Sequence, residues 1–61
     1  MELNYKFLVQ KFERKHWVTK METLDLVAAY EFAHDYAAKT LERVRVLRVD
    51  EVELAKFYFT R

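Results

Sequence analysis

The stretch LDLVAAYEFAHDYAAKTLE, residues 24–42, has a helical pattern and decides the fold predicted for the whole chain. Its apolar residues recur at helical spacing and would lie on one stripe at about 100° per residue. Thr23 is placed to be the N-cap, because its hydroxyl can accept a hydrogen bond from a backbone N–H two or three residues on. Asp25 would then lie in the first turn and complement the helix dipole. The predicted buried stripe consists of Leu26, Ala29, Tyr30, Ala33, Ala37 and Leu41.

Three aromatic residues of this helix cannot share one face. At about 100° per residue, Tyr30 points into the core, Tyr36 lies at its border and Phe32 points outward. Phe32 and Tyr36 are four residues apart and are therefore neighbours on the helix surface. We expect them to form an exposed aromatic ridge that anchors a protein partner. The alternative is that a neighbouring loop or terminal segment covers the ridge.

Alternating segments on both sides of the helix predict two β-hairpins. The charged run Glu13-Arg14-Lys15 interrupts the first alternation, and Asp50-Glu51 is the expected turn of the second hairpin. The predicted fold is α+β, a ββαββ chain in which one helix covers one face of a small antiparallel sheet. The predicted strands cover residues 3–12, 16–22, 43–49 and 54–59.

The chain contains no Gly, Pro or Cys. The absence of Cys excludes a disulfide framework, a Cys-based zinc site and thiol redox chemistry. The absence of Gly excludes P-loops and dinucleotide-binding loops, so the turns must use Asp, Asn, Glu, Lys and Arg. Residues 1–61 form a single domain near the lower size limit for independent folding, and we expect a partner or self-association to add stability.

Charge is divided along the chain although the net charge is only +1. Residues 1–20 hold five basic and two acidic residues, residues 21–42 hold one basic and five acidic residues, and the remainder hold five basic and three acidic residues. An acidic helix would thus lie between basic strands. No apolar run approaches the roughly 20 residues that span a bilayer, and Met1-Glu2-Leu3 begins no signal peptide, so we expect a soluble, cytoplasmic protein.

No residue pattern supports catalysis or metal binding. His34 and Asp35 are adjacent and diverge by about 100° on a helix. His16 has no further ligand at a spacing that metal sites use. Neither Ser nor Cys is present as a nucleophile. We therefore expect a protein that is not an enzyme and that holds no cofactor or metal.

The strands support a second functional hypothesis, in which aromatic and basic side chains of the sheet bind RNA or DNA. The three arginines that follow the helix would contact phosphate, or would instead form a solvated strand face or pair with the acidic helix. The competing interpretation places the aromatic residues in the core, because the sheet needs one apolar face. The basic residues concerned are Lys6, Arg43, Arg45, Arg48 and Lys56, and the aromatic residues are Tyr5, Phe7, Phe57 and Phe59.

Several short strings resemble small host-takeover proteins of lytic bacteriophages. The opening MEL, Phe12 and the Thr19-Lys20 pair before the helix are similar to the T4 Dmd type of antitoxin, which neutralises a host endoribonuclease toxin. The string ETLD at residues 22–25, an acidic helix and RVRV at residues 43–46 resemble the T7 type of inhibitor of host RNA polymerase. The chain lacks the Gly and Pro residues that follow the helix in that inhibitor. The resemblance implies a small protein that binds and blocks a larger bacterial protein inside the host cell.

The first functional hypothesis is therefore a non-enzymatic, phage-type inhibitor. Phe32 and Tyr36 would anchor it on a host toxin or nucleic-acid enzyme, while acidic residues steer the encounter. Direct binding of RNA or DNA through the basic strands is the alternative, and a homodimer that pairs an edge strand such as residues 55–60 is a third. The acidic residues expected at the partner surface are Asp25, Glu31, Asp35 and Glu42.

Overall fold

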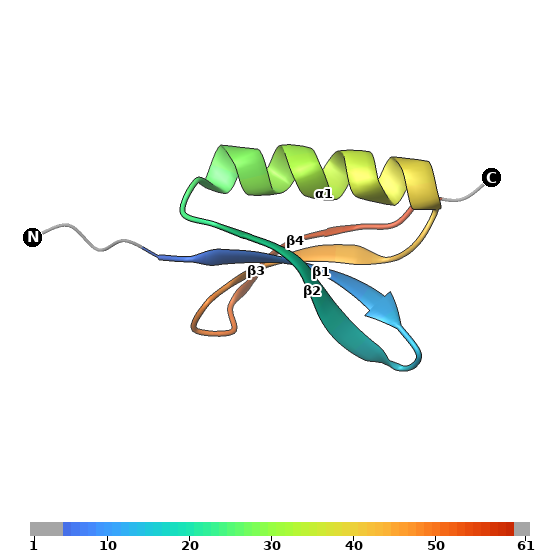
Figure 1. Ribbon diagram of the computed structural model, residues 1–61, viewed down its shortest axis with the longest axis horizontal. Coiled ribbons are helices and arrows are strands. Elements are labelled where there is room, and N and C mark those ends of the chain that lie inside the picture. Colours follow the sequence, from blue (N-terminus) through green and yellow to red (C-terminus); the bar gives the residue numbers. More distant parts are fainter. Residues whose placement is uncertain (1–4, 60–61) are drawn as a thin grey trace, which may run out of the picture.

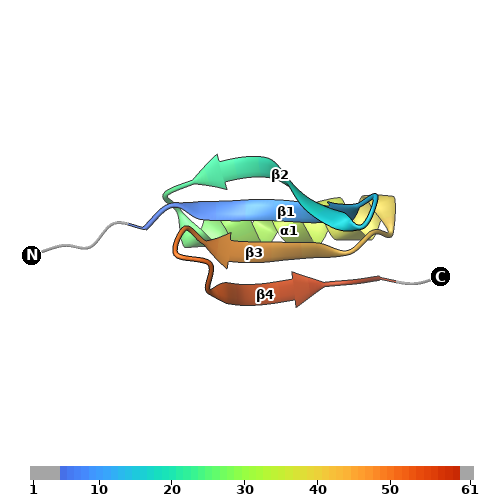
Figure 2. The same cartoon turned by 90° about the horizontal axis from the view of Figure 1, so that it is seen from below.

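The computed structural model describes residues 5–59 as four strands and one helix. All neighbouring strands are antiparallel, the order in the sheet is β2-β1-β3-β4, and α1 lies across one face (Figure 1, Figure 2). The predicted α+β fold with one helix on a small antiparallel sheet is confirmed. The elements are β1 (Phe7–Glu13), β2 (His16–Thr23), α1 (Leu26–Thr40), β3 (Val44–Arg48) and β4 (Glu53–Phe57).

The outer strands of the sheet are β2 and β4, since each pairs on one side only. The edge strand predicted at residues 55–60 corresponds to β4, which begins at Glu53 and ends at Phe57. Residue 60 lies outside the described residues. The strand predicted over residues 3–12 begins only at Phe7, and its first two positions also lie outside the described residues. Within residues 5–59, no helix has the length and apolar character needed to cross a membrane.

Helix α1 begins later than predicted because Asp25, and not Thr23, is its N-cap. The Asp25 backbone is extended, and its carboxylate accepts a 3.0 Å hydrogen bond from the Val27 N–H. An acidic N-cap also complements the helix dipole. Thr23 stays in β2 opposite Phe7, and its hydroxyl accepts a hydrogen bond from the Asp25 N–H. The predictions of Thr23 as the N-cap and of Asp25 in the first turn are therefore wrong.

Turns without glycine require other residues in the left-handed backbone region. Arg14 and Lys15, with φ of 53° and 70°, form the two-residue turn between β1 and β2. Asn-Gly is the usual choice at such a turn, because both positions need positive φ. Glu51, with φ of 70°, lies in the β3–β4 turn, and Leu41, with φ of 59°, caps the end of α1. Charged residues thus occupy the centre of both hairpin turns, as predicted, and Val49 and Val52 complete the second turn.

The core lies between α1 and the sheet, and small side chains let the helix approach the strands closely. Ala29, Ala33 and Ala37 are fully buried, which confirms the centre of the predicted stripe. Leu26 and Tyr30 are half-buried, and Leu41 lies outside the helix as its C-cap, because α1 ends at Thr40. Tyr30 and Tyr36 are both half-buried and pack against this cluster, so the helix is held on both flanks. The sheet side of the fully buried core consists of Val9, Val44 and Val46.

Candidate functional site

Helix α1 presents a different pair of side chains on each flank of its buried stripe. Tyr30 and His34 lie on the flank that faces β4, beside Ala55. Phe32 and Tyr36 lie on the opposite flank, four residues apart, with ring centroids 5.8 Å apart and an interplanar angle of 30°. Phe32 is 36% exposed, whereas Tyr36 is half-buried. The predicted aromatic ridge of Phe32 and Tyr36 therefore exists, and Phe32 is its exposed end.

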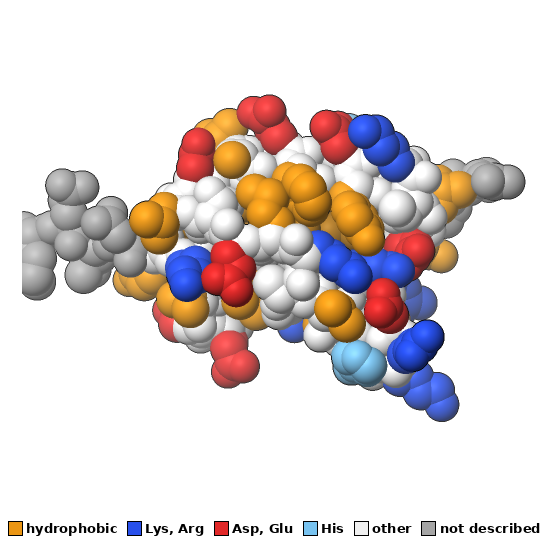
Figure 3. Space-filling model, viewed as in Figure 1, with side chains coloured by type: hydrophobic (Ala, Val, Ile, Leu, Met, Phe, Trp, Pro, Cys, Tyr) orange, Lys and Arg blue, Asp and Glu red, His pale blue; other side chains and the backbone are white. Residues whose placement is uncertain are grey.

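The aromatic ridge borders a hollow of about 210 Å³ on the helix surface. Figure 3 shows hydrophobic side chains gathered along the side of α1 that faces β2, with acidic side chains along the outer edge of the helix. A partner approaching from this side would meet an apolar strip with carboxylates along its outer edge and basic side chains on its sheet side and near one end of the helix. The residues that line the hollow are Phe32, Asp35, Tyr36 and Lys39.

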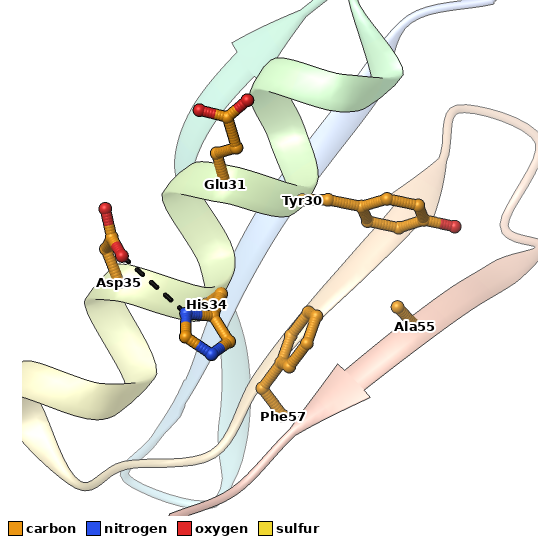
Figure 4. Close-up of a pocket in the computed structure, with 6 residues that line it drawn as sticks. All are labelled: Tyr30, Glu31, His34, Asp35, Ala55 and Phe57. Atoms are coloured by element: carbon orange, nitrogen blue, oxygen red, sulfur yellow. Dashed lines mark ion pairs between the residues drawn. The ribbon is translucent and has the colours of Figure 1, made fainter.

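A larger hollow of about 430 Å³ lies between α1 and β4 (Figure 4). The His34 ring meets the Phe57 ring edge-on, with centroids 5.8 Å apart. Figure 4 shows these two rings turned toward one another, whereas Glu31 and Asp35 point outward from the helix. Asp35 borders both hollows, so the crest of the helix between them is acidic. The lining residues are Tyr30, Glu31, His34, Asp35, Ala55 and Phe57.

The four acidic residues predicted to steer a partner fall into two groups. Glu31 and Asp35 are exposed on the helix crest, and within residues 5–59 neither forms an ion pair with a Lys or Arg. Asp25 is the N-cap of α1. Glu42 lies after the helix, where its carboxylate is 2.7 Å from the Lys11 Nζ. Asp25 and Glu42 therefore have structural roles. Asp35 is available beside the aromatic ridge, and Glu31 lies on the helix crest toward the β4 flank.

Lys11 organises a small ion-pair network at one end of the sheet. Its Nζ lies 2.7 Å from Glu42 and 3.0 Å from Glu13, and Lys20 lies 3.8 Å from Glu13. Hydrogen bonds to Glu42 and Glu13 raise the pKa of Lys11 well above its usual range. The hydrogen bond from Lys11 lowers the pKa of Glu13. The network connects the end of β1 to the segment that follows α1.

Both histidines lie at the surface of the molecule. His34 Nδ1 lies 3.6 Å from Asp35 Oδ1, which exceeds hydrogen-bond length, and the two side chains are 56% and 71% exposed. His16 is exposed, and its Nδ1 lies 3.1 Å from the Arg14 carbonyl oxygen. Among the residues from 5 to 59, no three His, Cys, Asp or Glu side chains are grouped so that they could hold a metal ion.

Three of the four aromatic residues predicted as a nucleic-acid platform, Phe7, Phe57 and Phe59, pack against the core. The Arg48 guanidinium lies over the Tyr5 ring, with its central carbon 4.4 Å from the ring centroid. Arg48 also donates two hydrogen bonds, of 2.8 and 2.9 Å, to the Asp50 carboxylate. These hydrogen bonds raise the pKa of Arg48 and lower that of Asp50. The core interpretation is therefore confirmed for Phe7, Phe57 and Phe59, whereas Tyr5 contacts Arg48. The residues packed against the core are Phe7, Phe57 and Phe59.

The opposite face of the sheet, here called the open face, carries another aromatic set. Phe12 lies opposite Trp17 of β2. On its other side, the Phe12 N–H donates a hydrogen bond to the carbonyl of Arg43, the residue before β3. Val44 is paired with Phe57 in the antiparallel strands β3 and β4. Continuing this register by one residue places Arg43 opposite Tyr58. We call this cross-strand set the aromatic row. It consists of Trp17, Phe12, Arg43 and Tyr58.

Arginine side chains contact every ring of the aromatic row. The Arg43 guanidinium lies 5.6 Å from the Phe12 centroid and 5.5 Å from the Tyr58 centroid. Arg45 lies 4.2 Å from the Trp17 centroid. Arg43 and Arg45 alternate with Val44 and Val46 in the sequence. Because successive side chains of a strand point to opposite faces, this alternation was the sequence signal that both arginines lie on the face away from the helix. Neither arginine pairs with the acidic helix in the described part of the chain.

Comparison with protein-family models, with curated proteins and with solved structures finds no significant match to this chain. We therefore assign a function from the geometry of α1 and of the open face.

Proposed function

We propose that this protein is a non-enzymatic binding protein that inhibits a larger bacterial protein by docking the outer surface of α1 onto it. The supporting observation is the aromatic ridge beside the available carboxylate of Asp35, with the exposed carboxylate of Glu31 further round the helix crest. Aromatic side chains that become buried at the centre of an interface supply most of its affinity. Carboxylates at the rim favour a basic partner surface and orient the encounter.

The helix offers these side chains in a fixed position. The fully buried stripe of Ala29, Ala33 and Ala37 seats α1 on the sheet. Tyr36 packs against the same core and supports Phe32 from one turn away. A surface that is already ordered loses little conformational entropy when it binds, so more of the contact energy remains as affinity. The aromatic ridge therefore suits a partner with a preformed apolar groove.

The resemblance to phage host-takeover proteins suggests which partners to test first. One class is a toxin ribonuclease, which an antitoxin neutralises, and the other is a nucleic-acid enzyme such as RNA polymerase. Both classes carry basic surfaces that bind nucleic acid through its phosphates. An acidic helix crest is complementary in charge to such a surface. Occupation of that surface by α1 would exclude the nucleic acid by direct competition in the cytoplasm of the host cell.

The test is a parallel capture from bacterial lysate treated with nuclease. The variant Phe32→Ala plus Tyr36→Ala should lose the host protein that the unaltered chain retains. The control is Val49→Ala plus Val52→Ala, which shortens two side chains in the β3–β4 turn that are 52% and 40% exposed. This control should retain the host protein. Since truncation of an interface hot spot costs about 2 kcal/mol, we expect the double variant to bind at least roughly 30-fold more weakly.

A second measurement asks whether binding inhibits. The retained host protein is purified and assayed with increasing amounts of this protein, and its activity should fall as the complex forms. Circular dichroism of each variant checks that α1 and the sheet are intact. Equal retention by the two double variants would remove the aromatic ridge as the binding site. An unchanged activity of the saturated complex would contradict inhibition.

A further inference from the structure

The open face is a second surface with its own chemistry. Figure 2 looks onto it: the strands lie in front and α1 lies behind them. Adjacent strands lie about 4.8 Å apart, so the aromatic row extends over about 14 Å from Trp17 to Tyr58. Tyr58 is 58% exposed at one end of the row, and Arg43 is exposed beside it. Planar groups are thus presented side by side on one face.

A polar row next to the aromatic row holds Arg45 in place. The Arg45 Nε donates a 2.8 Å hydrogen bond to the Gln10 Oε1, and the Gln10 Nε2 donates a 3.1 Å hydrogen bond to the Thr19 hydroxyl. Lys56 lies opposite Arg45 on β4. This chain of hydrogen bonds fixes the guanidinium against the Trp17 ring. Positive charge is therefore positioned close to the rings.

The open face is positively charged around these rings. Glu53 lies 3.9 Å from both Arg45 and Lys56, so one carboxylate faces two cations. Arg43, which separates the Phe12 and Tyr58 rings, forms no ion pair with a carboxylate in residues 5–59. The helix crest on the other side of the molecule is acidic. The two surfaces therefore select ligands of opposite charge.

We propose that the open face binds single-stranded nucleic acid. Bases stack on aromatic rings and on arginine guanidinium groups, and backbone phosphates pair with the neighbouring cations. A duplex keeps its bases stacked inside and cannot use the aromatic row. An acidic peptide would pair with the arginines but would leave the rings without planar partners. The stacking residues are Trp17, Phe12 and Tyr58, and the phosphate-binding residues are Arg43, Arg45 and Lys56.

Trp17 is the only tryptophan of the chain, so its fluorescence reports directly on the proposed site. The probe is an oligouridylate of about ten nucleotides, within the usual range of site sizes for single-strand binding. A base that binds against Trp17 and the Arg45 guanidinium on its ring should quench the fluorescence in a saturable way. If about three phosphates are neutralised, the logarithm of the affinity should fall with the logarithm of salt concentration with a slope of about −2.

Two variants of exposed residues test the open face without disturbing the core. Tyr58→Ala should weaken binding by about tenfold, since one base loses its stacking partner. Arg43→Gln should weaken binding and reduce the salt slope by about 0.7, because one phosphate contact is lost. The matched controls on α1 are Phe32→Ala and Lys39→Gln, which remove one aromatic ring and one positive charge. Both controls should bind the oligonucleotide as the unaltered chain does.

Several outcomes would overturn the proposal. Absence of saturable quenching, or equal weakening by the α1 controls, would show that the open face is not a nucleic-acid site. Equal binding of a duplex of the same length would exclude stacking on the aromatic row. Equal binding of polyglutamate would point to an acidic protein as the ligand. The capture experiment on α1 uses nuclease-treated lysate, so its result is independent of these outcomes.

Discussion

The Lys11 Nζ lies 2.7 Å from a carboxylate oxygen of Glu42, and this contact joins the connection after α1 to the central strand β1. The same nitrogen lies 3.0 Å from Glu13, so one half-buried cation holds two carboxylates. The charge pattern of the sequence predicts that Glu42 lies on an acidic surface that steers a partner. Its contact with Lys11 shows that Glu42 also has a structural role at the junction of helix and sheet.

Acid is expected to destabilise the fold through Glu13 and Asp50, whose pKa values are lowered by hydrogen bonds from Lys11 and Arg48. The stability that they provide is present above their ordinary pKa values of 4.5 and 3.8, and is lost as the pH falls through the lower folded values. The raised pKa of Lys11 affects stability at alkaline pH. The stability that the charged Lys11 provides is fully present below pH 10.5 and is lost as the pH rises through the pKa of the folded state.

Urea unfolding followed by Trp17 fluorescence from about pH 7 to about pH 3 measures this loss. The variant Lys11→Gln should be less stable than the unaltered chain near neutral pH. It should also lose less stability on acidification, because Glu13 no longer has its partner. Parallel pH profiles for the two proteins would contradict the assigned network.

Glycine at two turn positions is expected to stabilise the protein. A residue other than glycine in the left-handed region costs roughly 1–2 kcal/mol of stability, and substitution by glycine removes this cost. Part of the benefit is lost because glycine has a larger conformational entropy in the unfolded chain. Lys15→Gly and Glu51→Gly should therefore each raise the free energy of unfolding by about 0.5–1 kcal/mol. Thermal unfolding checks this against Lys39→Gly in α1, which should lower stability by about 1 kcal/mol. A decrease for Lys15→Gly would show that its backbone is not left-handed.

The close approach of α1 to the sheet predicts a strong size limit at Ala33, which is fully buried. Ala33→Leu should lower the free energy of unfolding by about 1–3 kcal/mol, because the larger side chain would push the helix away from the strands. Ala38→Leu places the same side chain on the exposed surface of the helix and should change stability by less than about 0.5 kcal/mol. Similar stabilities of the two variants would be incompatible with this packing.

The N-cap separates the structural role of Asp25 from its predicted role in binding. Asp25→Ala should cost about 1 kcal/mol of stability, whereas Asp25→Asn keeps a capping oxygen and should cost little. Asp25→Asn should also retain the host protein in the capture experiment. Asp35→Asn, which removes a charge from the helix crest, should slow association with a basic partner. Weaker capture by Asp25→Asn than by Asp35→Asn would reverse this assignment.

Local periodicity predicted the helix and its buried stripe, because Ala29, Ala33 and Ala37 recur at helical spacing. The start of the helix could not be predicted in the same way. Thr23 and Asp25 are both good N-caps, and the choice depends on whether Thr23 is held in β2 by its pairing with Phe7. That pairing joins residues far apart in the sequence and belongs to the tertiary fold.

The two candidate surfaces also differ in whether a local sequence pattern could predict them. The aromatic ridge consists of two residues one helical turn apart, so the spacing of Phe32 and Tyr36 was sufficient to predict it. The aromatic row brings together side chains from four separate segments of the chain. Its assembly depends on the strand order β2-β1-β3-β4, which no local pattern contains.

The most direct test of the central claim is site-specific photocrosslinking in bacterial cells. A benzophenone amino acid replaces Phe32 in one protein and Val52, an exposed residue of the β3–β4 turn, in another. The proposal predicts that irradiation joins the Phe32 position to one host protein, whose identity mass spectrometry then gives, and that the Val52 position yields no such product. Crosslinking to that host protein from the Val52 position but not from the Phe32 position would show that the aromatic ridge of α1 does not face the partner.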